Sequence, residues 1–454
     1  MNVPPTNAEP GVDPGSVFDG IDFTGLKSVI VAVSGGSDSL ALLYLLIAFS
    51  KSRPSFPDIV AVTIDHGLRP ESAEEARYVS RLCNETGISH RILNWAGPKP
   101  ATGLSAKARA ARYALLCEAA RDSGTDMILT GHTLDDQIET FVMRSSRTGE
   151  GRSERGLAGM APATLLDREI WLVRPLLKMS RGTLRNYLGS KGITWCEDPS
   201  NDDPKYERVR IRKALEQDDR ERVHDEIVKK VQQRLLLNEQ SAKLLRHCVT
   251  VYDGLRVEIR REGWLQQNAN AQRLAIGVLL AMVGGHSFLP AADICGKALR
   301  HIVADDLPGR ITLSRCILQR RKGCVLIYRE MRSLPEITIE PHQTAVWDGR
   351  YRIGNQTPCP LHVTACGADG LDVLKKDGHI MSHRGSALSG PALVNGGKIV
   401  AMPPNMPQEI SVTRHLALFD HILSGYDEIL AQSVAEIFQA QSYKRCPVNQ
   451  INKN

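Results

Sequence analysis

Residues 26–177 alternate between short runs rich in valine and isoleucine and longer segments with helical periodicity. This alternation constrains the fold more than any other feature of the chain, because parallel strands are joined by crossovers that are usually helical. We therefore predict an α/β domain built on a parallel sheet with helices on its faces. The expected strands are residues 28–33, 59–64, 90–94, 127–130 and 170–173.

Two helix starts are predicted in the same region. Ser72 and Glu75 have the spacing of a capping box, in which two side chains satisfy the free backbone N–H groups at a helix start. Ser105 precedes the alanine-rich segment 106–121. We expect both serines to be N-caps, because a serine hydroxyl accepts a bond from the first turn.

The pattern changes after residue 201. Residues 206–246 lack proline and glycine and predict one or two long helices, residues 271–283 predict another helix, and residues 310–328 predict strands. The 454 residues exceed one domain of about 100 to 200 residues. We expect a flexible tail at 1–24, the α/β domain at 25–215, a helical and α+β domain at 216–335, a small α+β domain at 336–425, and a C-terminal helix and tail at 426–454.

Composition excludes several classes of protein. The chain is 42% hydrophobic and 24% charged, as globular proteins are. Its most apolar stretch, residues 40–49, is half of the roughly 20 residues that a membrane-spanning helix needs. The first 22 residues carry no lysine or arginine, which disfavours a signal peptide, and none of the ten cysteines forms a CxxC pair. We expect a cytoplasmic protein without membrane contacts.

A glycine loop follows the first expected strand and precedes a helix over residues 40–49. Its position is that of a phosphate-binding loop in an open α/β sheet. It lacks the GK[ST] ending of a Walker A motif and the GxGxxG spacing of dinucleotide folds. A turn with a capping serine would explain the glycines, whereas an aspartate beside phosphates is explained by a divalent metal between them. The loop residues are Ser34, Gly35, Gly36, Ser37, Asp38 and Ser39.

Polar residues also follow the second and fourth strands. Asp65 and His66 come after the second, where either a nucleotide-lining loop or an ordinary turn would fit. After the fourth, His132, Asp136 and Glu139 share one face if the segment is helical. An acidic helix start that is favoured by the helix dipole would also explain these acids. On the alanine-rich helix, Arg109 and Arg112 are either surface residues or phosphate ligands.

The glycine loop resembles the PP-loop of the ATP pyrophosphatase superfamily, whose members cleave ATP between the α and β phosphates and form an adenylated intermediate. Later segments extend the resemblance, over residues 28–212, to the tRNA(Ile)-lysidine synthase family. In two places the chain departs from that family: Val209 stands where an asparagine is frequent, and the loop 144–159 is longer and richer in arginine. The segments are 131–140, 174–177, 197–201 and 206–212, with weaker matches at 329–330 and 347–350.

The resemblance implies an enzyme that joins free L-lysine to carbon 2 of the wobble cytidine of tRNA(Ile) with a CAU anticodon. It implies ATP as a substrate, converted to AMP and pyrophosphate, and Mg²⁺ as the metal, held by Asp38 and Asp136. The implied catalytic residues are Asp38, Asp136, Glu139, Arg112 and Arg208. The implied ATP-binding residues are Ser34, Gly35, Gly36, Ser37, Asp38, Ser39, Asp65, His66, Gly131 and His132.

Basic residues suit a polyanionic partner, which the net charge of +6 permits. Each is either a tRNA backbone contact or part of a solvated helix face. A PP-loop tRNA thiolation enzyme is the alternative, although a cysteine pair would be expected there. The expected tRNA contacts are Arg208, Arg210, Arg212 and Lys213 in one run, and Arg144 and Arg147, with Arg152 and Arg155, in another.

Overall fold

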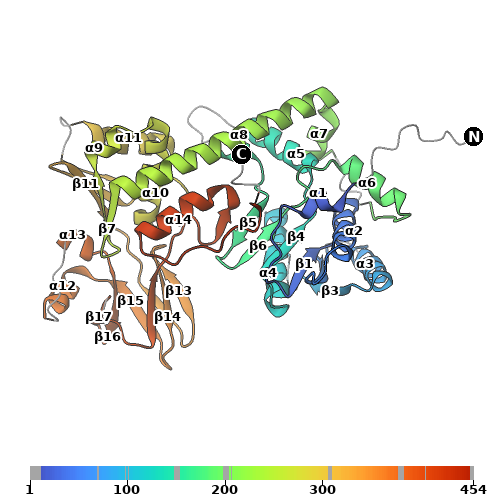
Figure 1. Ribbon diagram of the computed structural model, residues 1–454. Helices are drawn as coiled ribbons and strands as arrows, with labels where there is room; N and C mark the ends of the chain where they lie inside the picture. Colours follow the sequence, from blue (N-terminus) through green and yellow to red (C-terminus); the bar gives the residue numbers. More distant parts are fainter. Residues whose placement is uncertain are drawn as a thin grey trace, which may run out of the picture.

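The computed structural model describes residues 12–68, 71–97, 99–100, 102–147, 154–197, 204–205, 207–304, 309–376, 383–403 and 405–449. The first domain lies at one side of the molecule (Figure 1). A five-stranded sheet and two smaller sheets lie at the other side, and the long helix α8 (Gln217–Cys248) runs between the two parts.

The first domain contains a seven-stranded sheet with the order β19-β5-β6-β4-β1-β2-β3. Its five parallel strands confirm the predicted α/β fold, and each lies within one residue of its predicted bounds. Two further strands, which we did not predict from the sequence, extend one edge in the antiparallel direction. The strands are β1 (Ser28–Ala32), β2 (Asp58–Asp65), β3 (Ser89–Asn94), β4 (Met127–Thr130), β5 (Ala163–Leu166), β6 (Ile170–Val173) and β19 (Ile422–Ser424).

Helices cover both faces of this sheet. Val29 and Val31 of β1 pack into the core on the side of α2, α3 and α6, whereas Ile30 and Ala32 pack on the side of α4. A strand that is buried on both faces needs apolar residues throughout, which explains the continuous run in the sequence. The helices are α2 (Ser37–Lys51), α3 (Ser72–Thr86), α4 (Leu104–Asp122) and α6 (Arg181–Ser190).

The two predicted N-caps are wrong. Helix α3 begins at Ser72 itself, with Glu71 as its N-cap, because the Ser72 hydroxyl donates to Asp65 Oδ1 at 2.7 Å. Helix α4 begins one residue before Ser105, and its N-cap is Gly103 in the left-handed conformation. In both cases the chain entering the helix from the carboxyl edge of the sheet decides where the helix starts.

The N-terminal segment is partly ordered. Residues 1–11 lie outside the described residues, but α1 (Pro14–Phe18) is capped by Asp13, and Phe18 is fully buried. The Phe18 ring lies 5.2 Å from that of Phe49 on α2, measured between centroids. Residues 12–24 therefore pack against the core of the first domain, contrary to the flexible tail that we expected.

The region after residue 206 begins with two helices, α7 (Glu207–Ala214) and α8, as predicted. Helix α8 is about 48 Å long at the usual rise of about 1.5 Å per residue, and it ends against a five-stranded antiparallel sheet. In the described part of the chain, no helix is long and apolar enough to cross a membrane. The sheet and its helices are β7 (Val249–Tyr252), β8 (Arg256–Arg260), α9 (Arg261–Leu265), α10 (Ala269–Gly284), α11 (Ala292–Val303), β9 (Arg310–Leu313), β10 (Cys316–Arg321) and β11 (Cys324–Arg329).

Two small sheets follow, and the chain then returns to the first domain. β19, although inside the region 336–425 that we expected to be a separate domain, pairs with β5, and α14 (Glu428–Ile437) packs along α8. The other expected domain boundaries stay predictions. The remaining elements are β12 (Ile337–Ile339), β13 (Thr344–Trp347), β14 (Tyr351–Asn355), β15 (Leu361–Ala365), α12 (Gly367–Lys376), α13 (Arg384–Ala387), β16 (Pro391–Asn395), β17 (Lys398–Ala401) and β18 (Ile410–Arg414).

Candidate active site

The glycine loop joins the end of β1 to the start of α2. Gly35 has a φ of +85°, a conformation that favours glycine, and Gly36 is the N-cap of α2. The Ser34 N–H donates to the Ser39 hydroxyl at 3.0 Å, and that hydroxyl donates to the Gly36 carbonyl at 3.1 Å. The loop is thus held by its own serines, and the N–H groups in the first turn of α2, which have no helical acceptor, face an anion position.

The loop lies at the point of the sheet where the strand order reverses. β1 has β2 on one side and β4 on the other, so the connections after β1 and β4 meet at the carboxyl edge. Gly131, directly after β4, touches the start of α2: a β-carbon there would lie 2.9 Å from the Asp38 carbonyl oxygen and 3.0 Å from Ser39 Cα. Because both atoms belong to the backbone, the close approach requires glycine at position 131.

Helix α5 (Leu134–Ser145) carries the predicted acids into this region. It begins with a capping box in which Asp136 Oδ2 accepts from the Thr133 backbone N–H at 2.9 Å and from its hydroxyl at 3.1 Å. His132 precedes the helix, so the expectation that it shares a helical face with Asp136 and Glu139 is wrong. The helix-cap alternative therefore accounts for Asp136 Oδ2, whereas Oδ1 faces Arg181.

Arg181, at the start of α6, connects the glycine loop to α5. Its Nε donates to Asp38 Oδ2 at 3.0 Å, and its Nη2 lies 3.7 Å from Asp136 Oδ1. Its backbone N–H donates to Asp135 Oδ2 at 2.7 Å, and Arg220 of α8 pairs with the other oxygen of Asp135. Burial opposes the charge of Arg181, but Asp38 and Asp136 outweigh this effect and raise its pKa. Sequence reasoning missed this arginine.

Glu139 is the most buried acid of the site, with 1% of the residue exposed. Its Oε1 accepts from Arg212 Nε at 2.8 Å, whereas its Oε2 is buried and has no partner among the described residues. A buried carboxylate oxygen without a partner is unfavourable unless a ligand completes it. Arg212, on α7, is directed inward to Glu139. Its contact with tRNA stays a prediction.

The positive charges of several arginines act on His132. Its Nδ1 lies 3.0 Å from the Thr130 hydroxyl. Burial, followed by the charges of nearby arginines, lowers the pKa of His132 well below its usual value, so the imidazole is neutral at pH 7. The positive charges converge here from α4, from the end of β6 and from α7, which is the environment of an anion site. The arginines are Arg174, Arg112, Arg109 and Arg208.

Asp65 and His66, after β2, have different surroundings. Asp65 Oδ1 accepts from the Ser72 hydroxyl and from the Gly67 N–H at 2.8 Å; these bonds, the former contributing most, lower its pKa despite partial burial. Asp65 therefore shapes the loop. The pKa of His66 is lowered by burial and then by Arg112, and its Nδ1 is buried without a partner among the described atoms. The charge of Arg112 thus acts on His66 as well as on His132.

Comparison with known proteins identifies the family. Residues 18–218 match a family model described as a PP-loop domain. The tRNA(Ile)-lysidine synthases of Brucella canis, Brucella suis and Brucella melitensis are each 40% identical to this chain over 441 residues, which cover 93% of it and 97% of each relative. The chain belongs to the tRNA(Ile)-lysidine synthase family. The family consists of PP-loop enzymes, and the match extends through the C-terminal sheets.

A solved structure, the U34-tRNA thiolase NcsA of Methanococcus maripaludis with its [4Fe-4S] cluster, is also similar. It is 16% identical, covers 49% of this chain and 78% of its own, and has a TM-score of 0.40. This likeness is too weak to support any inference about this member of the lysidine synthase family.

Other basic residues that we predicted from the lysidine synthase resemblance lie around the end of α5 and on α7. Arg144 donates to the carbonyls of Gly156 (2.6 Å) and Gly159 (3.2 Å), and Arg147 pairs with Glu207. Arg210 donates to the carbonyls of residues 204 and 205 (2.8 and 2.9 Å), and Lys213 is exposed near the end of α7. Their contacts with tRNA stay predictions. Arg152, residues 198–201 and Tyr206 lie outside the described residues.

Arg155 belongs to a different network. Its guanidinium donates to Asp427 Oδ1 at 2.7 Å and to Asn238 Oδ1 at 2.8 Å, and only 17% of its side chain is exposed. It therefore joins α8 to the start of α14, and its expected contact with tRNA stays a prediction.

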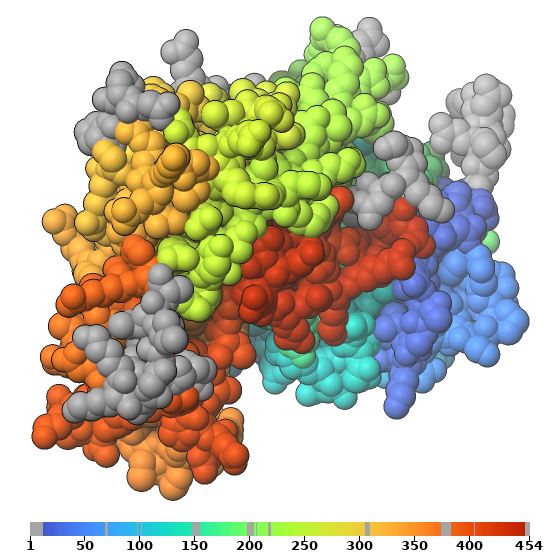
Figure 2. Space-filling view, turned by 60° about the vertical axis from the view of Figure 1, so that its left-hand side comes forward, coloured from blue at the N-terminus to red at the C-terminus, as the bar shows by residue number. Residues whose placement is uncertain are grey.

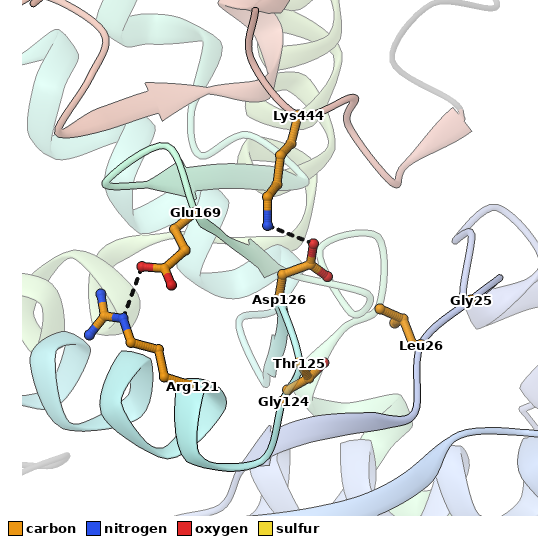
Figure 3. A pocket seen from close by; sticks show the side chains of 8 residues that line it. All are labelled: Gly25, Leu26, Arg121, Gly124, Thr125, Asp126, Glu169 and Lys444. Carbon is orange, nitrogen blue, oxygen red and sulfur yellow. Dashed lines mark hydrogen bonds and ion pairs between the residues drawn. The ribbon is translucent and has the colours of Figure 1, made fainter. Parts of the chain in front are cut away.

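A surface depression of about 530 Å³ lies at the opposite edge of the first sheet (Figure 3). Its charged side chains pair with one another, Arg121 with Glu169 and Lys444 with Asp126, each at 2.9 Å. The depression is next to the amino ends of the strands, where this fold does not place its ligands. It marks the contact of the C-terminal segment with the first domain. The lining residues are Gly25, Leu26, Arg121, Gly124, Thr125, Asp126, Glu169 and Lys444.

Proposed function

We propose that this protein ligates free L-lysine to carbon 2 of the wobble cytidine in tRNA(Ile) with a CAU anticodon, with ATP converted to AMP and pyrophosphate. The observation that carries the proposal is the convergence of three features at one sheet edge, in a member of this family. These are the glycine loop with Asp38, the buried Glu139 with one unpartnered oxygen, and the arginine cluster around His132.

The first step is adenylation of the tRNA. The carbon 2 oxygen of cytidine attacks the α-phosphate of ATP, and pyrophosphate leaves. The N–H groups at the start of α2 are suited to hold the departing phosphates, because they present unpaired donors and the positive end of the helix dipole. Arg112 and Arg208 belong to the arginine cluster, and we assign to them the neutralisation of the charge that develops on the α-phosphate.

The residues present fit Mg²⁺ that arrives with ATP. In the described ranges, no group of three or more histidine, cysteine or acidic side chains is placed to hold a metal by itself. Mg²⁺ bound to a nucleotide usually takes only one or two protein carboxylates together with phosphate oxygens. Asp38 and Asp136 supply two such carboxylates beside the loop. Mg²⁺ bound there would neutralise part of the phosphate charge.

The second step joins lysine to the activated base. The side-chain amine of lysine is protonated in solution and must lose a proton before it can attack carbon 2. Glu139 Oε2 is a buried oxygen without a partner among the described residues, so it can accept a hydrogen bond from the ammonium and then its proton. The amine attacks carbon 2, the bond from carbon 2 to the bridging oxygen breaks, and AMP leaves with that oxygen.

Lysine incorporation is the direct test. The purified protein would be incubated with transcribed tRNA(Ile) bearing CAU, ATP, Mg²⁺ and radiolabelled lysine. Label in the tRNA, recovered after digestion as a modified cytidine, is the expected result. The same transcript with uridine at the wobble position is the control and should stay unlabelled. If the CAU transcript also stays unlabelled while the protein binds ATP, the proposed function is wrong.

The thiolation alternative receives little support from the cysteines. Cys196 is next to the glycine loop, and its backbone N–H donates to the Gly35 carbonyl at 2.9 Å. Burial, and then the charge of Glu75, raise the pKa of its thiol, which disfavours the reactive thiolate. We therefore keep a single proposed function.

A further inference from the structure

Arg181 occupies the place between the two carboxylates to which we assign the metal. Its guanidinium contacts Asp38 and Asp136, and only 18% of the Arg181 side chain is exposed. Two hydrogen bonds fix the backbone of Arg181: the Ser180 hydroxyl caps α6 by accepting from the Thr183 N–H at 3.1 Å, and the Arg181 N–H donates to Asp135. The guanidinium is therefore built into the site.

A divalent cation that binds Asp38 Oδ2 and Asp136 Oδ1 competes with this guanidinium for the same two oxygens. Mg²⁺ bound to both would lie a few ångströms from a unit positive charge in a partly buried region, where repulsion is much stronger than in water. Arginine cannot relieve that repulsion by losing a proton, because its pKa exceeds about 12 in proteins. Each cation therefore weakens the binding of the other at these two carboxylates.

We propose that Arg181 is a displaceable counter-ion, which occupies the carboxylates of Asp38 and Asp136 in the nucleotide-free protein and gives them up to the divalent cation that arrives with ATP. This inference rests on the proposed function for the location of the metal. The consequence is an order of binding. Without nucleotide, Arg181 suppresses metal binding; with nucleotide, the polyphosphate offers the displaced guanidinium a new anionic partner.

Binding of Mn²⁺ to the intact protein tests the proposal without relying on activity. Free Mn²⁺ would be followed by electron paramagnetic resonance during titration of the wild type and of Arg181→Gln, with and without a non-hydrolysable ATP analogue. Without nucleotide, we expect Arg181→Gln to bind Mn²⁺ about tenfold more tightly or better, because one repelling charge is removed. The nucleotide should enhance Mn²⁺ binding strongly in the wild type and much less in the variant.

Arg185→Gln is the matched control. Arg185 lies one turn further along α6 and pairs with Glu197 at 3.1 Å, and 41% of its side chain is exposed, against 18% for Arg181. Its loss should leave Mn²⁺ affinity within about twofold of the wild type, because an exposed charge is screened by water. Arg181→Lys, which keeps a positive charge, should remain closer to the wild type than Arg181→Gln, and thermal melting would show that each variant is folded.

Two results would overturn the proposal. One is wild-type Mn²⁺ affinity in folded Arg181→Gln without nucleotide. The other is a gain in affinity that persists when Asp38→Asn is added to Arg181→Gln, because the gain must come from the freed carboxylates. Lysine incorporation by the wild type is measured separately, so a failure of the proposed function is distinguishable from a failure of this inference.

Discussion

Asp136 and Glu139 lie on the same helix, but their oxygens are used differently. One oxygen of Asp136 closes the capping box of α5, and the other faces Arg181. Glu139 keeps one buried oxygen without a partner in the described part of the chain. We infer that Asp136 acts in the adenylation step and caps the helix, whereas Glu139 binds the lysine ammonium and accepts its proton.

Glu139→Gln tests this division. The substitution keeps the shape and the bond to Arg212 but removes the carboxylate that accepts the proton. Lysine incorporation should fall about 100-fold or more, the usual loss for a general base, while tRNA-dependent release of pyrophosphate continues. Both products would be measured in the same reaction. Asp136→Asn should reduce both, and equal losses in the two assays for Glu139→Gln would contradict its assignment to lysine.

Cys196→Ser separates ligation from thiolation at a single residue. The Cys196 backbone bond to Gly35 does not depend on the side chain, and the raised pKa of the thiol argues against a nucleophilic role. Lysine incorporation by the variant should therefore stay within about threefold of the wild type, since a catalytic nucleophile would be worth far more. A loss of 100-fold or more, with the fold intact, would reopen the thiolation alternative.

The sequence pointed to Asp38 from a local pattern and missed Arg181, whose place in the site depends on packing between distant segments. Asp38 was predicted from the glycine loop around it, because the loop, the strand and the helix are contiguous. Arg181 is 143 residues from Asp38 along the chain, and it enters the site only because α6 packs against α2. Its one local signal is its position directly after Ser180, the N-cap of α6, which is the first helix after the last parallel strand.

At the scale of elements, the site depends on contact between the end of β4 and the start of α2. Gly131→Ala should disturb it, because the new β-carbon would meet the backbone of Asp38 and Ser39 at 2.9–3.0 Å. We expect about 1–3 kcal/mol of destabilisation, as for other overpacked positions. ATP-dependent lysine incorporation should fall as the loop shifts. Urea denaturation and the incorporation assay would be compared.

Gly189→Ala is the control for this substitution. Gly189 lies within α6, and a β-carbon added there would meet no atom of the described residues within 4 Å. Alanine at this position should be neutral or slightly stabilising, by up to about 1 kcal/mol, because it has the higher helix propensity. If Gly131→Ala behaves like Gly189→Ala in both assays, the close approach at Gly131 is not needed by the site.

The parallel strands were predictable because each is buried on both faces and leaves a continuous apolar run. Their edge partners were not. β5 and β19 have only four and three residues, and they pair in the antiparallel direction. β19 comes from a segment far along the chain, beyond the small sheets, and no local pattern distinguishes it from the other short apolar runs there. Long-range closure of a sheet is decided by packing of the whole chain.

At the scale of the whole molecule, the C-terminal segment, which contains Asp420, β19, α14 and residue 448, connects the antiparallel sheets to the first domain. Figure 2 shows it in red as a band between the green helix α8 and the blue and cyan first domain. Asp427 accepts from Arg155 and Arg234 at the start of α14, and residue 448 forms a bridge with Ile21. A chain that ended after α7 would therefore lose an edge strand and core contacts of the nucleotide domain as well as the appended helices.

Asp420 is a buried acid of the same C-terminal segment, and its pKa is strongly lowered in the folded protein. Arg168 of the β5–β6 hairpin and the hydroxyl of Tyr443 each donate to its Oδ1 at 2.6 Å. Burial alone would raise the pKa of Asp420, but bonds from His415, Tyr443 and the Leu416 N–H, with the charge of Arg168, lower it to about 2. The ionised carboxylate therefore stabilises the folded state.

The sign of the pH dependence follows from that shift. Because the folded pKa is below the unfolded value, the ionised Asp420 contributes about 2 kcal/mol above roughly pH 4, and this falls to roughly half by pH 3. Asp420→Asn should therefore lower the free energy of unfolding at pH 7, and its deficit against the wild type should shrink as the pH falls to 3. Urea denaturation at pH 7, 4 and 3 would measure this deficit.

Asp167→Asn is the control. This substitution, which removes an exposed partner of His421, should change stability by less than about 0.5 kcal/mol at pH 7. A deficit for Asp420→Asn that stays constant from pH 7 to pH 3 would show that the carboxylate charge does not hold the C-terminal band to the first domain.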